Sequence, residues 1–101
     1  MTPIGGPLDR PVRVLVVDDA RTVRLLIRAL ASRDRRIEIV GEAADPIEAG
    51  QKLKELNPDV MTLDVEMPRM NGLVFLEKAL KHRPLPVIMI PSHTSANSDT
   101  A

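Results

Sequence analysis

Three aspartates are the side chains of this sequence best placed to do chemistry, because each follows an apolar run. Asp18 and Asp19 come directly after Val14–Val17. Asp64 follows a second apolar run that ends at Leu63. If the two runs form neighbouring parallel strands, their carboxyl ends meet at one edge of the sheet and bring the three carboxylates together. Crowded carboxylates repel one another unless a cation lies between them, and Mg²⁺ or Mn²⁺ suits oxygen ligands. The residues therefore predict a site for one of these ions.

The elements that would position these carboxylates alternate between strand and helix. Apolar runs and alternating patterns predict four strands, over Val12–Val17, Arg36–Gly41, Val60–Leu63 and Pro86–Ile90. Helical spacing of apolar residues predicts three helices, from Ala20 to Ser32, from Asp45 to Asn57, and from Leu73 to the segment His82-Arg83-Pro84. Strands that alternate with helices indicate a parallel sheet with right-handed crossovers.

The first two predicted helices carry recognisable local patterns. In the first, one apolar stripe is formed by Val23, Leu26, Ile27 and Leu30. The second has Asp45 as its N-cap, followed by Pro46 at the first helical position. We expect that helix to turn Ile47, Leu53 and Leu56 inward.

A longer motif connects these elements to a known family. The segments are Arg13–Asp19 (RVLVVDD), Asn57–Gly72 (NPDVMTLDVEMPRMNG) and Pro86–Ile90 (PVIMI). Together they resemble the receiver domain of bacterial two-component response regulators, most closely the receiver that heads chemotaxis protein-glutamate methylesterases. The resemblance implies an α/β fold, a flavodoxin-like doubly wound parallel sheet. Here we expect it truncated after the fourth strand, with about four strands and three helices. The receiver would span residues 12–91, between a flexible leader at 1–11 and a polar tail at 92–101.

The resemblance also implies roles for individual residues. Asp64 would accept a phosphoryl group from a histidine kinase or a histidine phosphotransfer protein. Mg²⁺ would be held by Asp18, Asp19, Asp64 and the backbone carbonyl of Glu66.

Two parts of the family's site differ in this sequence. Pro91 stands where the family has a serine or threonine that binds the phosphoryl oxygen, and it has neither a hydroxyl nor an amide hydrogen. Ser92 is the nearest candidate hydroxyl, although it is equally well read as an ordinary loop residue. The family's lysine after a fifth strand has no counterpart in this sequence. We therefore expect phosphorylation of Asp64 to be slow or incomplete.

Basic residues on the first helix have two open interpretations. Arg21, Arg24, Leu25 and Arg28 fall on one stripe of the helix. The pattern alone is typical of a solvated face. The resemblance implies instead that this helix docks the kinase or a phosphotransfer helix bundle, with Leu25 as an apolar anchor.

The predicted function is that of a phosphoacceptor signalling module without an output domain, and not that of an enzyme. One alternative is a receiver remnant that is not phosphorylated and acts by protein interaction or dimerisation. A less favoured alternative is a Mg²⁺-dependent aspartyl-phosphate hydrolase. That class requires a second aspartate two residues after the nucleophile, and Glu66 occupies this position.

Composition excludes several other functions. The 101 residues allow one domain, and the 14 Lys+Arg balance the 14 Asp+Glu, so we expect no nucleic-acid or membrane partner. The sequence has no cysteine and no apolar run long enough to span a membrane, which fits a cytoplasmic protein. His82 and His93 lack the spacing of a zinc site.

The fourth predicted strand suggests self-association. Val87, Ile88, Met89 and Ile90 are apolar and uncharged, and they lie between Pro86 and Pro91. As the last strand of the sequence, this segment would form an unpaired sheet edge, which invites pairing with another chain. We therefore expect a homodimer with contacts centred on residues 86–95.

Overall fold

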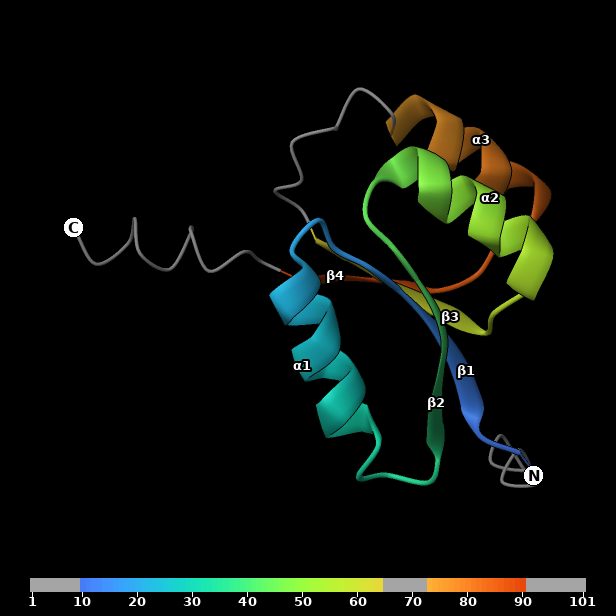
Figure 1. Ribbon diagram of the computed structural model, residues 1–101. Coiled ribbons are helices and arrows are strands. Elements are labelled where there is room, and N and C mark those ends of the chain that lie inside the picture. Colours follow the sequence, from blue (N-terminus) through green and yellow to red (C-terminus); the bar gives the residue numbers. More distant parts are fainter. Residues whose placement is uncertain (1–9, 65–72, 91–101) are drawn as a thin grey trace.

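The computed structural model describes residues 10–64 and 73–90, which fold into one sheet and three helices (Figure 1). In chain order the elements are β1 (Val12–Val17), α1 (Arg21–Ala31), β2 (Ile37–Ala43), α2 (Pro46–Leu56), β3 (Val60–Asp64), α3 (Leu73–His82) and β4 (Val87–Ile90). The predicted α/β fold is confirmed. Residues 1–9 of the predicted leader (1–11) and all of the predicted tail (92–101) lie outside the described residues, so these boundaries stay predictions.

The four strands are all parallel and lie in the order β2-β1-β3-β4. Helices α2 and α3 cover one face of the sheet, and α1 lies on the other (Figure 1). Val17 is opposite Leu63 in the register of β1 with β3. This pairing places the ends of β1 and β3 side by side at the carboxyl edge of the sheet.

The hydrophobic core lies between the sheet and the pair α2 and α3. Leu15, Leu53, Met61 and Leu76 are completely buried there. Burying an aliphatic side chain of this size contributes roughly 1.5–3 kcal/mol. At Gly50 an added Cβ would come within 2.5 Å of the Phe75 ring. The small residue therefore allows α2 and α3 to pack closely.

The start of α2 follows the predicted capping pattern. The side chain of Asp45 accepts a hydrogen bond of 2.8 Å from the backbone N–H of Glu48. In turn, Glu48 Oε1 accepts one of 2.8 Å from the backbone N–H of Ala44. These bonds satisfy donors that a helix start otherwise leaves open, and Pro46 occupies the first turn, where its missing N–H costs nothing.

Strand β2 corrects one predicted boundary, since it continues to Ala43 instead of ending at Gly41. The pairing of β1 with β2 shifts between Val14 and Leu15, whose partners are Ile39 and Gly41. Such an irregularity lengthens one strand relative to its neighbour, and no local sequence pattern identifies it. The longer β2 brings Glu42 level with the end of β1.

Two predicted apolar faces are less buried than expected. Helix α1 contacts β1 and β2 but has no buried residue, and Leu26 and Leu30 are 56% and 55% exposed. Among the described residues α1 is the only helix on its face of the sheet, so one side of its apolar stripe stays uncovered. Ile47, predicted to point inward, is also exposed because it lies on the side of α2 that faces solvent.

The amino end of the sheet is held by Asp59. Its carboxylate accepts hydrogen bonds of 2.8 and 3.1 Å from the guanidinium of Arg10, and one of 2.8 Å from the backbone N–H of Arg13. The hydrogen bond from the Arg10 side chain is the main reason that the pKa of Asp59 lies below its ordinary value. The bond from the backbone N–H of Arg13 is the next largest cause. The contact joins the start of β1 to the start of β3.

We expect Asp59→Asn to lower the free energy of unfolding at neutral pH by about 1 kcal/mol, since Arg10 is largely exposed and screened by solvent. A carboxyl with a lowered pKa in the folded state stabilises the fold above its unfolded pKa of about 3.9, and this stabilisation is lost as pH falls through the folded value. The deficit of Asp59→Asn in urea unfolding should therefore shrink as pH falls below about 4. A deficit that is independent of pH contradicts the role of the charge. Glu55→Gln, which removes an exposed charge on α2, is the matched control.

Candidate functional site

The three aspartates predicted to converge do lie together, at the carboxyl edge of the sheet. Asp64 ends β3, and Asp18 follows β1 directly. Because Val17 is opposite Leu63, Asp18 lies next to Asp64 on the neighbouring strand. One carboxylate oxygen from each of Asp18, Asp19 and Asp64 lies within 4.8 Å of the other two. The site therefore presents three hard oxygen ligands in a space that one cation can bridge.

The surroundings of the cluster make its negative charge costly. Asp18 is 6% exposed and Asp64 is 7% exposed, whereas Asp19 faces solvent. Burial raises the pKa of Asp18, and the negative charges of Asp64 and Asp19 raise it further. A hydrogen bond from the backbone of Ala20 and the positive charge of Arg24 oppose that rise. A cation between the carboxylates would offset the free-energy cost of burying their charges and would reduce their mutual repulsion.

Backbone contacts fix Asp18 at the junction of β1 and α1. Its N–H donates to the carbonyl of Ala43 at 3.0 Å, which continues the pairing of β1 with β2. Its Oδ1 accepts from the N–H of Ala20 at 2.9 Å. Ala20 has no side chain that could cap α1, so Asp18 supplies an acceptor for a backbone donor at the start of the helix.

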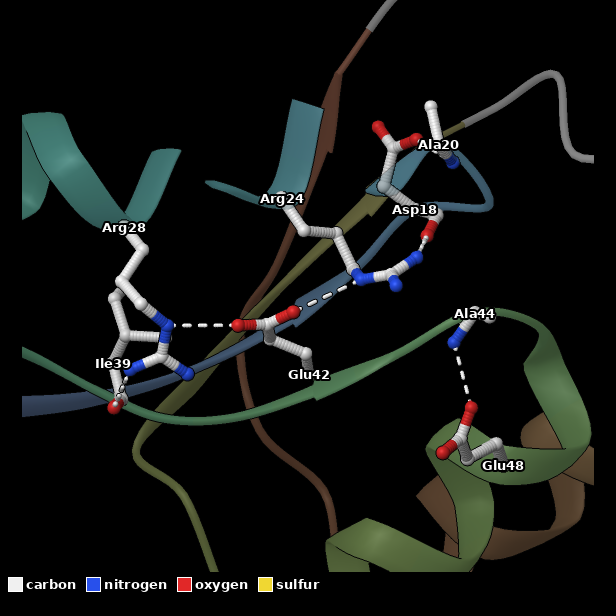
Figure 2. Close-up of polar contacts among 8 residues, drawn as sticks. All are labelled: Asp18, Ala20, Arg24, Arg28, Ile39, Glu42, Ala44 and Glu48. Carbon is white, nitrogen blue, oxygen red and sulfur yellow. Dashed lines mark hydrogen bonds and ion pairs between the residues drawn. The ribbon is translucent and has the colours of Figure 1, made fainter. Parts of the chain in front are cut away.

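Two arginines of α1 meet one carboxylate of β2 beside the cluster (Figure 2). Arg24 Nε donates to Glu42 Oε1 at 3.0 Å, and Arg28 Nε donates to Glu42 Oε2 at 2.7 Å. Arg24 also donates from Nη1 to the main-chain carbonyl of Asp18 at 2.7 Å. Sequence reasoning did not single out Glu42. In the sequence it is only an acidic residue directly after the predicted strand, and the shifted register decides what its charge contacts.

The predicted docking residues have different surroundings. Arg21 and Leu25 are both exposed, and 49% of the surface of Leu25 is accessible to solvent. Arg28 is exposed but bonded to Glu42, and the side chain of Arg24 is only 16% exposed. Arg24 is therefore turned toward the sheet. The role of these residues in docking stays a prediction.

Three further residues of the predicted site, Glu66, Pro91 and Ser92, lie outside the described residues. The carbonyl of Glu66 as a metal ligand and the hydroxyl of Ser92 as a phosphoryl contact therefore stay predictions. Ile90, the last residue of β4, is opposite Asp64.

The sequence and this geometry match one protein family. A family model described as the response regulator receiver domain matches residues 14–101. The chain belongs to the response regulator receiver domain family. Receiver domains are signalling modules, and an acidic cluster such as that of Asp18, Asp19 and Asp64 generally binds Mg²⁺ in them.

Curated relatives indicate which branch of the family this chain is similar to. A protein-glutamate methylesterase/protein-glutamine glutaminase of Xanthomonas oryzae pv. oryzae is 59% identical over 93 residues, which are 92% of this chain and 26% of the relative. A protein of the same description from Caulobacter vibrioides is 56% identical over 88 residues, or 87% of this chain and 26% of the relative. The chain therefore spans about a quarter of the length of the curated relatives it matches, and it is related to their receiver region.

Solved structures agree with this assignment. The response regulator domain of Thermotoga maritima CheB aligns with a TM-score of 0.70 and 39% identity, over 82% of this chain and 62% of that one. A complex of the P1 domain of CheA3 with CheY6 from R. sphaeroides aligns with a TM-score of 0.72 and 32% identity, over 89% of this chain and 75% of the matched chain. Among the residues that the structure describes, no helix is long and apolar enough to cross a membrane.

Proposed function

We propose that this receiver takes a phosphoryl group from a phosphohistidine onto Asp64, in a two-component system related to chemotaxis. The observation that carries the proposal is the buried carboxylate of Asp64 beside Asp18 and Asp19, at the carboxyl edge of a receiver sheet. The similarity to methylesterase receiver regions supports the link to chemotaxis. The activity of those longer proteins is not part of this proposal.

The residues present fit a divalent cation. Two buried carboxylates and one exposed carboxylate converge within 4.8 Å, and burial with mutual repulsion raises the pKa of Asp18. We propose that Asp18, Asp19 and Asp64 hold Mg²⁺ or Mn²⁺, and that the Glu66 carbonyl completes the protein ligands. When bound, the cation would neutralise charge on the phosphoryl oxygens.

The chemistry required of Asp64 is a single displacement. A carboxylate oxygen of Asp64 forms a bond to phosphorus while the bond from phosphorus to the histidine nitrogen breaks, and the electron pair leaves with the imidazole. The product is an acyl phosphate. Phosphoryl transfer depends mainly on positioning and charge stabilisation, so a rigid carboxylate at the end of a buried strand is a suitable acceptor.

The proposed donor is a histidine kinase or a histidine phosphotransfer protein. The matched complex of a CheA3 P1 domain with a CheY protein supports a partner of that kind. We propose that it docks on α1 through the set Arg21, Arg24, Leu25 and Arg28. Of these, Arg21 and Leu25 offer exposed surface on α1, which begins two residues after Asp19. We also propose a cytoplasmic location, and the balanced charge gives no electrostatic field that would favour a nucleic-acid or membrane partner.

We also propose that the 101-residue chain forms a homodimer through β4. In the described part of the chain β4 is an edge of the sheet, with Ile88 and Met89 53% and 55% exposed. An apolar edge strand offers unpaired backbone groups and apolar side chains to a second copy.

Cation binding is expected to raise thermal stability. Mg²⁺ at 100 times its dissociation constant should stabilise the chain by about 2.7 kcal/mol through mass action. Asp19→Asn should weaken Mg²⁺ binding about 10-fold in calorimetric titration, because it removes a charged ligand without altering the core. Glu55→Gln serves as the control, and it should bind as the wild type does. Unchanged affinity of Asp19→Asn would show that the cluster is not the cation site.

Acetyl phosphate with Mg²⁺ should label Asp64. Intact-mass spectrometry is expected to show one added phosphoryl group that hydroxylamine removes, as for an acyl phosphate. Asp64→Asn should take up none, because its amide oxygen is a poor nucleophile, whereas Glu55→Gln should be labelled normally. Label that persists in Asp64→Asn, or no label on the wild type, contradicts the proposed acceptor and favours an interaction module that is not phosphorylated.

Sedimentation velocity at low micromolar concentration should show a dimer. Ile88→Lys should shift it to the monomer, since a charge at the β4 edge would be buried between the two copies. Ile47→Lys replaces an exposed residue on α2 and should leave the dimer intact. A wild-type chain that sediments only as a monomer refutes the dimer.

A further inference from the structure

Three hydrogen bonds hold Asp18, two through its main chain and one through its side chain. Its N–H donates to the carbonyl of Ala43, its Oδ1 accepts from the N–H of Ala20, and its carbonyl accepts from Nη1 of Arg24. The first two contacts come from the main chain and follow from the strand pairing and the helix start. The third comes from a neighbouring side chain, so truncating that side chain deletes it and leaves the Asp18 carboxylate itself intact.

Arg24 is an unusual neighbour for the buried carboxylate of Asp18. A guanidinium beside a carboxylate normally forms a direct charge-assisted pair with it. Here Arg24 binds the main-chain carbonyl of Asp18, and its Nε is bonded instead to Glu42 on β2 (Figure 2). Its side chain is only 16% exposed, so this geometry is defined by packing against the sheet.

Glu42 explains why the arginine takes this position. It is opposite Val16 in the register of β2 with β1, so its side chain shares the α1 face of the sheet. One of its oxygens accepts from Arg24 and the other from Arg28. Glu42 therefore orients Arg24 toward the main-chain carbonyl of Asp18 and away from an ion pair with the Asp18 carboxylate.

We propose that Arg24, oriented by Glu42, is a positioning residue that fixes the main chain at Asp18 and thereby sets the two β1 carboxylates for the cation. The inference rests on the proposed function, because it assumes that the acidic cluster binds Mg²⁺. It assigns Arg24 a role inside the domain, distinct from contact with a partner protein.

The sign of one substitution separates positioning from simple charge. By Coulomb's law alone, removal of a positive charge beside a cation site should tighten cation binding. If Arg24 positions the ligands, Arg24→Ala should instead weaken Mg²⁺ binding, by about 10-fold, the lower end of the range for groups that orient metal ligands. Glu42→Ala should weaken it by a similar factor because it releases Arg24.

The test is Mg²⁺ titration by calorimetry on the 101-residue chain, without any phosphodonor. The variants are Arg24→Ala, Glu42→Ala and their double variant. Because both substitutions act through one contact, the double variant should bind about as weakly as Arg24→Ala, and not with the product of the two losses. Arg33→Gln is the matched control. Arg33 is an exposed arginine just beyond α1 and takes no part in the contacts among Arg24, Glu42 and Asp18, so the affinity of this variant for Mg²⁺ should equal that of the wild type.

Each outcome decides the proposal. Unchanged or tighter Mg²⁺ binding by Arg24→Ala, or losses that multiply in the double variant, would overturn it. If Arg24→Ala does not fold, Arg24→Lys replaces it in the test. Lysine keeps the positive charge but has a single nitrogen for the two partners of Arg24. Wild-type affinity for Mg²⁺ in Arg24→Lys would also overturn the proposal. A wild-type chain that binds no Mg²⁺ refutes the proposed cation site and this inference with it. Loss of binding in Asp19→Asn with normal binding in Arg24→Ala refutes the inference alone.

Discussion

The parallel pairing of β1 with β3 is the constraint on which the site depends. With Val17 opposite Leu63, the two strands end at the same level, and Asp18 and Asp64 follow at adjacent positions. A slip of one residue would turn Leu15 and Val17 away from the core beneath α2 and α3. Core packing therefore fixes the register, and the register in turn fixes the distance between the carboxylates. The acidic site is a consequence of the way in which the apolar core packs.

The acidic edge carries an electrostatic cost that the rest of the fold offsets. Burial of Asp18 next to Asp64 disfavours its charged form, as the raised pKa of Asp18 reflects. The amide of Ala20 and the charge of Arg24 reduce that cost without occupying the whole site. The structure thus keeps a region of concentrated negative charge that a cation would stabilise further. In a small domain, cation binding at such a site would add to stability.

Much of this architecture could be predicted from local sequence. The apolar runs and helical stripes predict the strands and helices to within a few residues, because burial requires these periodicities. The N-cap at Asp45 with Pro46 predicts the start of α2, since both effects act within one helical turn. The position of Asp18 and Asp64 directly after strands, together with the long motif around Asp64, predicted the acidic cluster. These are properties of neighbouring residues along the chain.

The sequence by itself determined which residues end the strands, and therefore which carboxylates meet. The contacts between elements were decided only by the tertiary structure. The shifted register of β2 brought Glu42 to Arg24, and the single helix on one face left Leu26 and Leu30 uncovered. Arg24 has the same helical spacing as a solvated residue, yet it is turned inward. The physical reason is that a charge pattern along a helix does not specify what the facing strand presents. That information arises only when distant segments pack together.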